Sequence, residues 1–259
     1  NLDELSEEER QRLMHASVFA RVTPAQKLNL VKFYQQQGEI VAMTGDGVND
    51  AAVLKQADIG VAMGKRGTDA AKQVADMVLL DDEFGTIVAA VRQGRVIFAN
   101  IRKSVVFMLC TNLAEILVVT FASLVPLPIP LRPLQILYLN VLTDVFPALA
   151  LGVGKGSDDV MIRKPRDPDE AVLGRDHWIA IGGWSVVIGV CVLISLVVAL
   201  HWLGLNEIQA VTVSFLTLAF SKLWFVLNLR DRDSSIWNND IVRNPWVWSS
   251  LLWCACLLL

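Results

Sequence analysis

Long apolar stretches dominate the chain beyond residue 103 and narrowly limit what it can fold into. Each of the first four approaches or exceeds the ~20 residues that a helix needs to cross a lipid bilayer. The five stretches cover residues 104–125, 134–153, 178–203, 208–229 and 246–259, and the fifth is cut short at the last residue. Because backbone groups in lipid must be satisfied within the segment, we predict an all-α transmembrane bundle of about five helices.

The composition indicates two different environments within one chain. Hydrophobic residues make up 54% of the 259 residues, which exceeds the usual share in a soluble domain. Charged residues are concentrated in the first 100 positions, whereas all eight tryptophans lie from Trp178 onward, where such rings can mark bilayer interfaces. The net charge of −3 and the lack of a basic tract argue against a nucleic-acid partner.

The first 85 residues have the pattern of an α/β domain. Three short apolar runs, at 40–43, 59–63 and 77–80, are separated by segments that can form helices. Alternating strands and helices predict a parallel sheet, so we expect an α/β domain over residues 1–85. A proline-free run from Phe84 to Val125 then predicts one helix of about 40 residues, roughly 60 Å long, at the start of a second domain over residues 86–259.

The loops between the predicted spans alternate in their content of basic residues. Because basic residues are retained on the cytoplasmic side, the loops that are rich in Lys and Arg are expected to be cytoplasmic, and with them residues 1–100. The loops on the opposite side hold only Arg132. The basic residues on the predicted cytoplasmic side are Arg102, Lys103, Lys155, Arg163, Lys164, Arg166, Arg175, Arg230, Arg232 and Arg243. The chain begins without methionine and ends within an apolar run, so we expect it to be a piece of a longer protein.

A polar loop follows the first predicted strand at the end where open α/β sheets bind ligands. Gly45 and Gly47 permit a sharp turn, and Asp46 and Asp50 supply the hard oxygen ligands that Mg²⁺ prefers. An isolated Gly-Asp-Gly is usually only a surface turn. The position and the paired carboxylates suit a magnesium site, and the longer string around them, described below, decides between the two interpretations.

Two further residues can complete a phosphate site beside this loop. Asn49 can donate a hydrogen bond to a phosphate oxygen. Lys27, on an earlier helix, can supply positive charge to the same oxyanion if the fold brings it across.

Two carboxylates, Glu115 and Asp144, lie inside the predicted spans, where an ionisable group is costly and therefore a functional candidate. Asn112 lies three residues before Glu115, while Asn140 and Thr143 share a helical face with Asp144. If the two faces meet, these oxygens form a site suited to a hard cation such as Ca²⁺. The alternative is that the polar groups only join the helices by hydrogen bonds.

Two other features of the spans bear on this site. Pro147 cannot donate a backbone hydrogen bond to Thr143, which frees a carbonyl oxygen beside Asp144. Lys222 lies within the fourth span, where it either extends toward the interface along its apolar stem or faces the bundle as a built-in counter-charge. We favour the first interpretation.

Several strings in the chain resemble the P-type ATPases. The string MTGDGVNDA at residues 43–51 resembles their hinge motif, within a phosphorylation domain of the haloacid-dehalogenase type. VFARVTP at 18–24, with Lys27, resembles their lysine segment, ADIGVAMG at 57–64 their next strand, and MVLLDD at 77–82 the start of their stalk helix.

The resemblance implies an ATP-driven cation pump that is phosphorylated on an aspartate. Lys27, Asp46, Asn49 and Asp50 would surround the phosphate and Mg²⁺, with Asp46 as the direct magnesium ligand. The phosphorylated Asp-Lys-Thr-Gly motif, the nucleotide-binding domain that takes ATP, the actuator domain and four membrane helices are absent from this sequence. We therefore expect the chain to be inactive alone and to act with the missing N-terminal portion of the same pump.

The resemblance also bears on the transported ion. Residues 112–115 and 139–144 look like the fifth- and sixth-helix site of calcium pumps, whereas sodium and proton pumps typically have Asp at the place of Asn140. Phe220 aligns with a glutamate that completes a second calcium site in two-site pumps, which puts that site in doubt. We favour Ca²⁺ and a bacterial plasma membrane. The alternatives are Mn²⁺ or Na⁺/K⁺ transport, or a non-catalytic cation-binding remnant or assembly partner.

Overall fold

The structure is a computed structural model that describes residues 6–125, 127–157, 159–167, 170–230, 235 and 239–258. The chain forms two compact units that meet in sequence between Val91 and Arg92. Each unit is described by itself.

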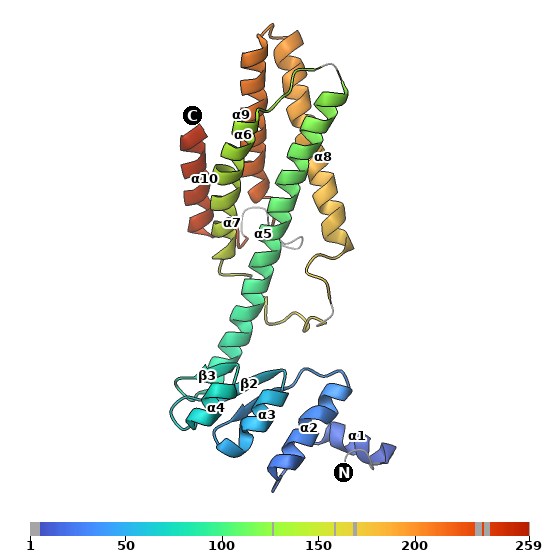
Figure 1. The fold of residues 1–259 in the computed structure, drawn as a ribbon, viewed down its shortest axis with the longest axis vertical. Helices are drawn as coiled ribbons and strands as arrows, with labels where there is room; N and C mark the ends of the chain where they lie inside the picture. Colours follow the sequence, from blue (N-terminus) through green and yellow to red (C-terminus); the bar gives the residue numbers. More distant parts are fainter. Residues whose placement is uncertain are drawn as a thin grey trace. The chain divides into compact units, whose positions relative to one another are not determined.

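The first unit contains a three-stranded parallel sheet flanked in sequence by short helices (Figure 1). The strands lie in the order β1-β2-β3, and Val61 at the centre of β2 pairs with Thr44 of β1 and Met77 of β3. The elements are α1 (Glu7–His15), α2 (Pro24–Gln36), β1 (Ala42–Gly45), the 3-10 turn η2 (Val48–Asp50), α3 (Ala51–Gln56), β2 (Ile59–Met63), α4 (Asp69–Val74) and β3 (Met77–Leu79).

The first strand lies two residues further along the chain than the apolar run at 40–43 predicts. Ile40 is 56% exposed, and the backbone N–H of Val41 donates to the carboxylate of Asp58 at 2.9 Å. Pairing with β2 begins at Ala42 and continues to Gly45. The apolar run therefore predicts the position of this strand wrongly, because the last two residues that pair with β2 are Thr44 and Gly45, which are not apolar.

Asp82 holds the loop that follows β2. Its carboxylate accepts backbone N–H groups from Gly64, Lys65 and Arg66 at 2.6, 3.0 and 3.0 Å. These donors, the N–H of Lys65 foremost, hold the pKa of Asp82 below its usual value. Because the folded pKa lies below the unfolded one, the carboxylate stabilises the loop above about pH 4, and this contribution is lost as the pH falls through the folded value.

We expect Asp82→Asn to loosen this loop at neutral pH. The neutral amide presents a single oxygen to three N–H donors, so amide hydrogen exchange at residues 64–66 is expected to accelerate about fivefold in the full-length protein. Asp69→Asn, at an exposed position in the first turn of α4, is the matched control. Equal exchange in the two variants would show that Asp82 does not hold the loop.

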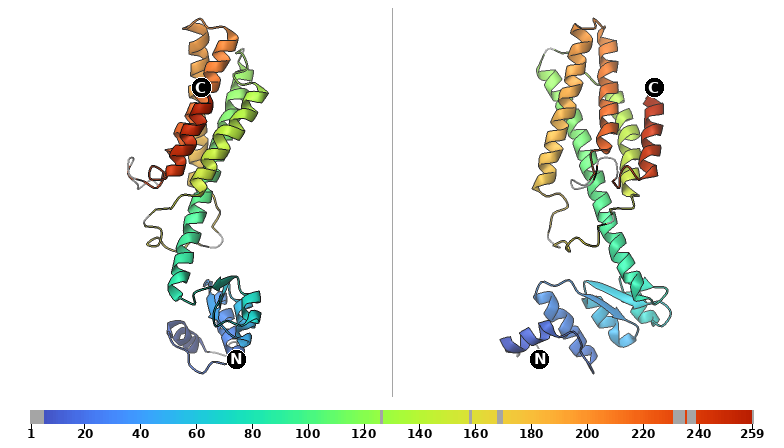
Figure 2. Two further views of the ribbon diagram at one scale, coloured as in Figure 1. Left: turned by 90° about the vertical axis from the view of Figure 1, so that its left-hand side faces the viewer. Right: turned by 180° about the vertical axis from the view of Figure 1, so that it is seen from behind.

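The second unit is helical. Its elements are most of α5 (Phe84–Leu124), then α6 (Pro133–Leu139), the π-helical segment η3 (Asn140–Asp144), α7 (Val145–Gly152), α8 (Arg175–His201), α9 (Glu207–Val226) and α10 (Pro245–Leu258). Helices α8 and α9 lie side by side along most of their lengths (Figures 1 and 2). Within the described part of the chain, four segments are long and apolar enough to cross a membrane: 84–124, 133–152, 175–201 and 207–226.

These two units confirm the predicted fold class of an α/β sheet domain followed by a helical bundle with membrane-spanning candidates. Helix α10 is a shorter apolar helix. Of the residues used in the sequence predictions, Arg232 and Leu259 lie outside the described residues.

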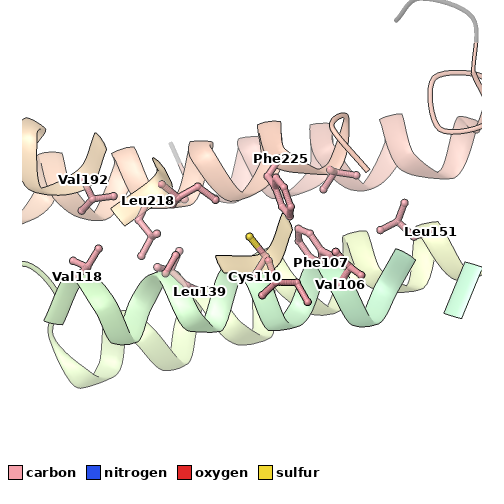
Figure 3. Packing of buried hydrophobic residues seen from close by; sticks show 14 of the residues in the cluster. Val106, Phe107, Cys110, Val118, Leu139, Leu151, Val192, Leu218 and Phe225 are labelled. Carbon is pink, nitrogen blue, oxygen red and sulfur yellow. The ribbon is translucent and has the colours of Figure 1, made fainter. Parts of the chain in front are cut away.

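The core of the bundle is built from side chains that project inward from several helices (Figure 3). Phe107 of α5 stacks on Phe225 of α9, with ring centroids 6.3 Å apart and an interplanar angle of 16°. Val118, Leu139 and Leu218 fill the same cluster and are fully buried or nearly so. This cluster packs α5, α6 and α9 against one another.

Polar side chains of α5 also hold the segment that follows α7. The Asn100 amide donates to the carbonyl oxygens of Gly152 and Gly154 at 3.2 and 2.7 Å. Gly156 has a φ of +73°, and a Cβ there would lie 2.6 Å from a methyl carbon of Val96. The glycine therefore allows this segment to pass directly against α5.

Candidate functional site

The polar loop at the end of β1 is shaped by close contact between Gly45 and Asp50. A Cβ built at Gly45 would lie 2.7 Å from the Cβ of Asp50. Glycine is therefore required for the chain to turn from β1 into η2 and α3 at this point. The turn leaves Asp50 buried, with 8% of its surface exposed, at the carboxyl end of the strand.

Lys27 reaches this loop from α2. The helix begins after Thr23, whose hydroxyl caps it, and Lys27 lies in its first turns. The Lys27 ammonium contacts the Asp50 carboxylate at 2.7 Å. The fold therefore brings together two of the candidate phosphate-site residues from positions 23 residues apart.

Asp46, Gly47 and Asn49 lie along the accessible side of the same turn. The side chains of Asp46 and Asn49 are exposed, and the Asp46 carbonyl accepts the N–H of Thr68 at 2.8 Å. Among the described residues, no group of three or more His, Cys, Asp or Glu side chains forms a metal cluster. Asp46 and Asp50 are hard oxygen donors that fit Mg²⁺, which can take its remaining ligands from water and phosphate.

A second polar cluster is buried in the helical bundle around Lys222 of α9. Its ammonium lies 2.6 Å from Glu115 of α5 and 3.0 Å from Asp144, the last residue of η3. The exposed fractions of Lys222, Glu115 and Asp144 are 0, 5 and 2%. Two acidic side chains from neighbouring segments therefore share the ammonium of Lys222 within an apolar core.

Neutral polar groups complete the cluster. The Thr111 hydroxyl donates to Asp144 at 3.3 Å, and the Thr143 hydroxyl contacts the other oxygen of Asp144 at 3.4 Å. The Asn140 amide, oriented with its nitrogen toward Glu115, donates to both carboxylate oxygens at 3.1 and 3.2 Å. The buried carboxylates are thus hydrogen-bonded as well as paired.

The π-helical segment η3 positions the oxygens of the 133–152 span. Its wider turn covers Asn140 to Asp144, which contains three of the predicted site residues. The Thr143 hydroxyl bonds the carbonyl of Leu139 at 2.8 Å, while the Leu142 carbonyl accepts the thiol of Cys254 at 3.2 Å. A break of this kind presents backbone oxygen atoms to side chains, and such bulges recur at functional sites.

The structure brings together four of the five predicted membrane-site residues, namely Glu115, Asn140, Thr143 and Asp144. The Asn112 amide instead donates to the carbonyl of Met108 on its own helix at 2.7 Å. Thr111 was missed by the sequence analysis. Its position four residues before Glu115, on the same helical face, is the signal that could have identified it.

The interpretation of Lys222 as a side chain extending toward the interface is wrong. The side chain is completely buried, and its ammonium contacts both carboxylates. The attraction of the Lys222 ammonium to the two carboxylates outweighs the hydration that it would gain at the interface. This attraction offsets the cost of burying the charged lysine. Phe220, two residues earlier, is 41% exposed and lines an apolar cavity away from this cluster.

Comparison with protein families matches both parts of the chain. Residues 128–259 match the model of the C-terminal part of cation-transporting ATPases, and residues 26–91 match haloacid dehalogenase-like hydrolases. The first match covers the helical segments from α6 to α10. The second contains the sheet and the polar loop at the end of β1.

Individual relatives carry the same family description. A calcium-transporting ATPase of Bacillus subtilis is 45% identical over 100% of this chain, and one of Listeria monocytogenes is 40% identical over 99%. A P-type sodium-transporting ATPase of Toxoplasma gondii is 46% identical over 77% of this chain. The chain spans 29% of the Bacillus and Listeria proteins and 15% of the Toxoplasma protein.

The matches agree with the geometry of both sites. A haloacid dehalogenase-like sheet carries acidic groups at the end of its first strand, and a helical bundle with four candidate membrane spans buries two carboxylates. The chain therefore belongs to the P-type cation-transporting ATPase family and is part of a multi-pass integral membrane protein.

Proposed function

We propose that the full-length protein is an ATP-driven pump that transports Ca²⁺ across a membrane through an aspartyl-phosphate intermediate. The observation that carries this proposal is that Glu115 and Asp144, from two different membrane segments, are buried around the Lys222 ammonium, which lies 2.6 and 3.0 Å from them. Carboxylate, amide and hydroxyl oxygens around one point are the ligands that Ca²⁺ takes.

Lys222 acts as a counter-charge in this scheme. Glu115 and Asp144 together carry two negative charges when ionised, and the ammonium neutralises one of them. A divalent ion arriving at the site displaces the ammonium and is coordinated by the carboxylate oxygens in its place. The lysine then holds the carboxylates in place between transport events, when no cation is bound.

The loop of Gly45, Asp46 and Gly47 handles phosphate and Mg²⁺ in the same proposal. Asp46 is exposed and free to ligate Mg²⁺ directly, while Asp50 is positioned by Lys27 and supports it. Asn49 donates to the phosphate, and the positive charge of Lys27 stabilises negative charge on its oxygens. Mg²⁺ supplies further charge stabilisation of the transferring phosphoryl group. The phosphorylated aspartate and the ATP site belong to the portion of the pump outside this sequence.

Helix α5 links phosphate chemistry to ion binding. It begins at Phe84, just after β3, and the same unbroken helix carries Glu115. Asp81 fixes this beginning by accepting the hydroxyl of Thr86 at 2.6 Å and the N–H of Glu83 at 3.1 Å. A tilt of the helix that follows phosphorylation would therefore change the position of Glu115 relative to Asp144.

The orientation follows from the distribution of basic residues. Residues 1–100 and the basic loops after α7 and α9 are cytoplasmic in this proposal. The host membrane is the plasma membrane of a bacterium, in keeping with relatives from Bacillus and Listeria. The partner of the chain is the N-terminal portion of the same pump.

Two alternatives concern the ion and the activity. The relative from Toxoplasma is named for sodium transport, so Na⁺ or K⁺ is a second candidate beside Mn²⁺. A non-catalytic cation-binding remnant, or an assembly partner of a separate chain, is the remaining candidate.

Phosphorylation of the full-length protein by labelled ATP tests the proposal. We expect Ca²⁺ to stimulate formation of a hydroxylamine-sensitive phosphoprotein in the presence of Mg²⁺, and Glu115→Gln to abolish the stimulation because a charged ligand is lost. Asn112→Ala is the matched control, because the Asn112 amide bonds a carbonyl of its own helix. This variant is expected to retain the stimulation by Ca²⁺.

Different outcomes separate the alternatives. Stimulation by Mn²⁺ or Na⁺ in place of Ca²⁺ would reassign the ion. Lack of any phosphoprotein under all cations would contradict the pump and favour the non-catalytic alternative.

A further inference from the structure

A basic cavity lies where α5 and α8 change from polar to apolar sequence. It has a volume of about 1140 Å³ and lies between α5, the segment after α7, the start of α8 and the end of α9. Seven Arg or Lys residues line it, against three Asp or Glu, among the residues that the structure describes. Its wall also contains Val106 and Trp184, so it reaches from charged groups into the apolar part of the bundle.

Two arginines converge on this cavity around one aromatic ring. The guanidinium carbon of Arg102 lies 5.0 Å from the ring centroid of Phe98, and that of Arg166 lies 4.0 Å from the same centroid. Arg102 belongs to α5, whereas Arg166 belongs to the segment between α7 and α8. Both positive groups are thus held beside the same ring, and an anion bound next to them would be attracted by both charges.

The hydrogen bonding of Arg102 is incomplete. The Nε of Arg102 is buried and has no hydrogen-bond partner among the described residues. Another nitrogen of the same guanidinium contacts the Glu170 carboxylate at 3.4 Å, and Glu170 is itself half exposed. A buried donor without an acceptor is costly, and an anionic oxygen in the cavity would satisfy it.

A second, apolar cavity shares a wall with the basic one. It has a volume of about 670 Å³ between α8, α9 and α10. Trp184, Phe225 and Asn228 line both cavities, and the first two rings lie 5.6 Å apart. Its other lining residues are mostly apolar and include Cys191, one to two helical turns further along α8 from Trp184. A molecule that fills both cavities has an anionic end and a long apolar end.

We propose that these two cavities bind one anionic phospholipid. Its phosphate pairs with Arg102 and Arg166, and one acyl chain passes Trp184 and Phe225 into the apolar cavity. The charge of the basic cavity selects an anionic over a zwitterionic headgroup, because basic pockets beside membrane helices attract anionic lipids. The apolar cavity distinguishes a lipid from a soluble phosphate, which offers nothing to bury there.

Native mass spectrometry of the delipidated full-length protein tests this site. We expect one dioleoyl phosphatidylglycerol to bind at least about tenfold more tightly than dioleoyl phosphatidylcholine. Each basic residue near a lipid surface contributes about fivefold, so Arg102→Gln with Arg166→Gln is expected to weaken phosphatidylglycerol binding about 25-fold. Arg92→Gln, an exposed arginine of α5 outside the cavity, is the matched control and is expected to change nothing.

The apolar end is tested separately. Cys191→Trp adds bulk to the apolar cavity and is expected to weaken dioleoyl phosphatidylglycerol at least tenfold while leaving the short-chain dihexanoyl lipid unaffected. Binding of phosphatidylcholine to the arginine variant, and of the short-chain lipid to the cysteine variant, checks that each variant is folded. Equal binding of the two dioleoyl lipids to the unaltered protein would overturn the proposal. Binding of glycerol 3-phosphate as tight as that of phosphatidylglycerol would overturn it too, because the site would then be one for soluble anions.

Discussion

Replacing Lys222 by methionine is expected to destabilise the cation-free protein by about 3–5 kcal/mol, because it leaves two buried carboxylates without their positive partner. The side chain is completely buried and contacts both Glu115 and Asp144, so water cannot take over its role. The expected fall in Tm is on the order of 10 °C. Thermal unfolding followed by tryptophan fluorescence measures it.

Calcium is expected to restore much of this loss. In the variant, the carboxylates are free to bind the ion without displacing an ammonium, and a ligand at about 100 times its Kd adds about 2.7 kcal/mol. The rise in Tm on adding Ca²⁺ should therefore be larger for Lys222→Met than for the unaltered protein.

Lys103→Met is the matched control for this prediction. Lys103 forms a largely buried ion pair with Asp240 outside the cluster, so its loss should lower Tm without enhanced rescue by Ca²⁺. If Lys222→Met gains no more from Ca²⁺ than Lys103→Met does, Lys222 is a structural residue and not a counter-charge at a cation site.

Gly94→Pro is expected to abolish cation transport while leaving ATP hydrolysis measurable. A proline in a helix interior costs about 3 kcal/mol or more, removes a backbone hydrogen bond and introduces a kink. Gly94 lies in α5 between Phe84 and Glu115, so the kink interrupts the helix that is proposed to join the two sites. Parallel assays of ATP hydrolysis and ion uptake in reconstituted vesicles measure the change as a fall in ions moved per ATP.

Gly94→Ala separates the effect of the kink from that of the substitution itself. A Cβ at this position meets no atom within 4 Å, and alanine favours the helix by about 1 kcal/mol relative to glycine. We expect this variant to couple hydrolysis to transport as the unaltered protein does. Unchanged coupling in Gly94→Pro would show that the continuity of α5 does not carry the signal.

Periodicity and apolar length were sufficient to predict most of the elements. The runs at 59–63 and 77–80 became β2 and β3 within one residue, since neither run is interrupted by a polar residue. The helix predicted from Phe84 to Val125 ends one residue earlier, at Leu124. The first strand was displaced because the backbone of its polar end, at Thr44 and Gly45, pairs with β2 irrespective of side-chain polarity.

The contacts within the sites were less predictable. Helical spacing put Asn112 and Glu115 on one face, but the Asn112 amide reaches back to Met108, and Thr111 contacts Asp144 instead. A spacing of three or four residues defines a broad face and does not fix which side chain is central. The π-helical turn of η3 further rotates the residues after Asn140 relative to an ideal helix.

The sequence by itself determined the membrane helices, the parallel sheet and the residue types of both polar sites, because these follow from local apolarity, glycine and charge. Only the tertiary structure decided the role of Lys222. An isolated lysine in an apolar helix is expected to extend toward water, and the opposite outcome depends on carboxylates 107 and 78 residues away in the chain. Glu115 and Asp144 lie on separate helices, which have to pack together before the two carboxylates can offset the cost of burying the Lys222 ammonium.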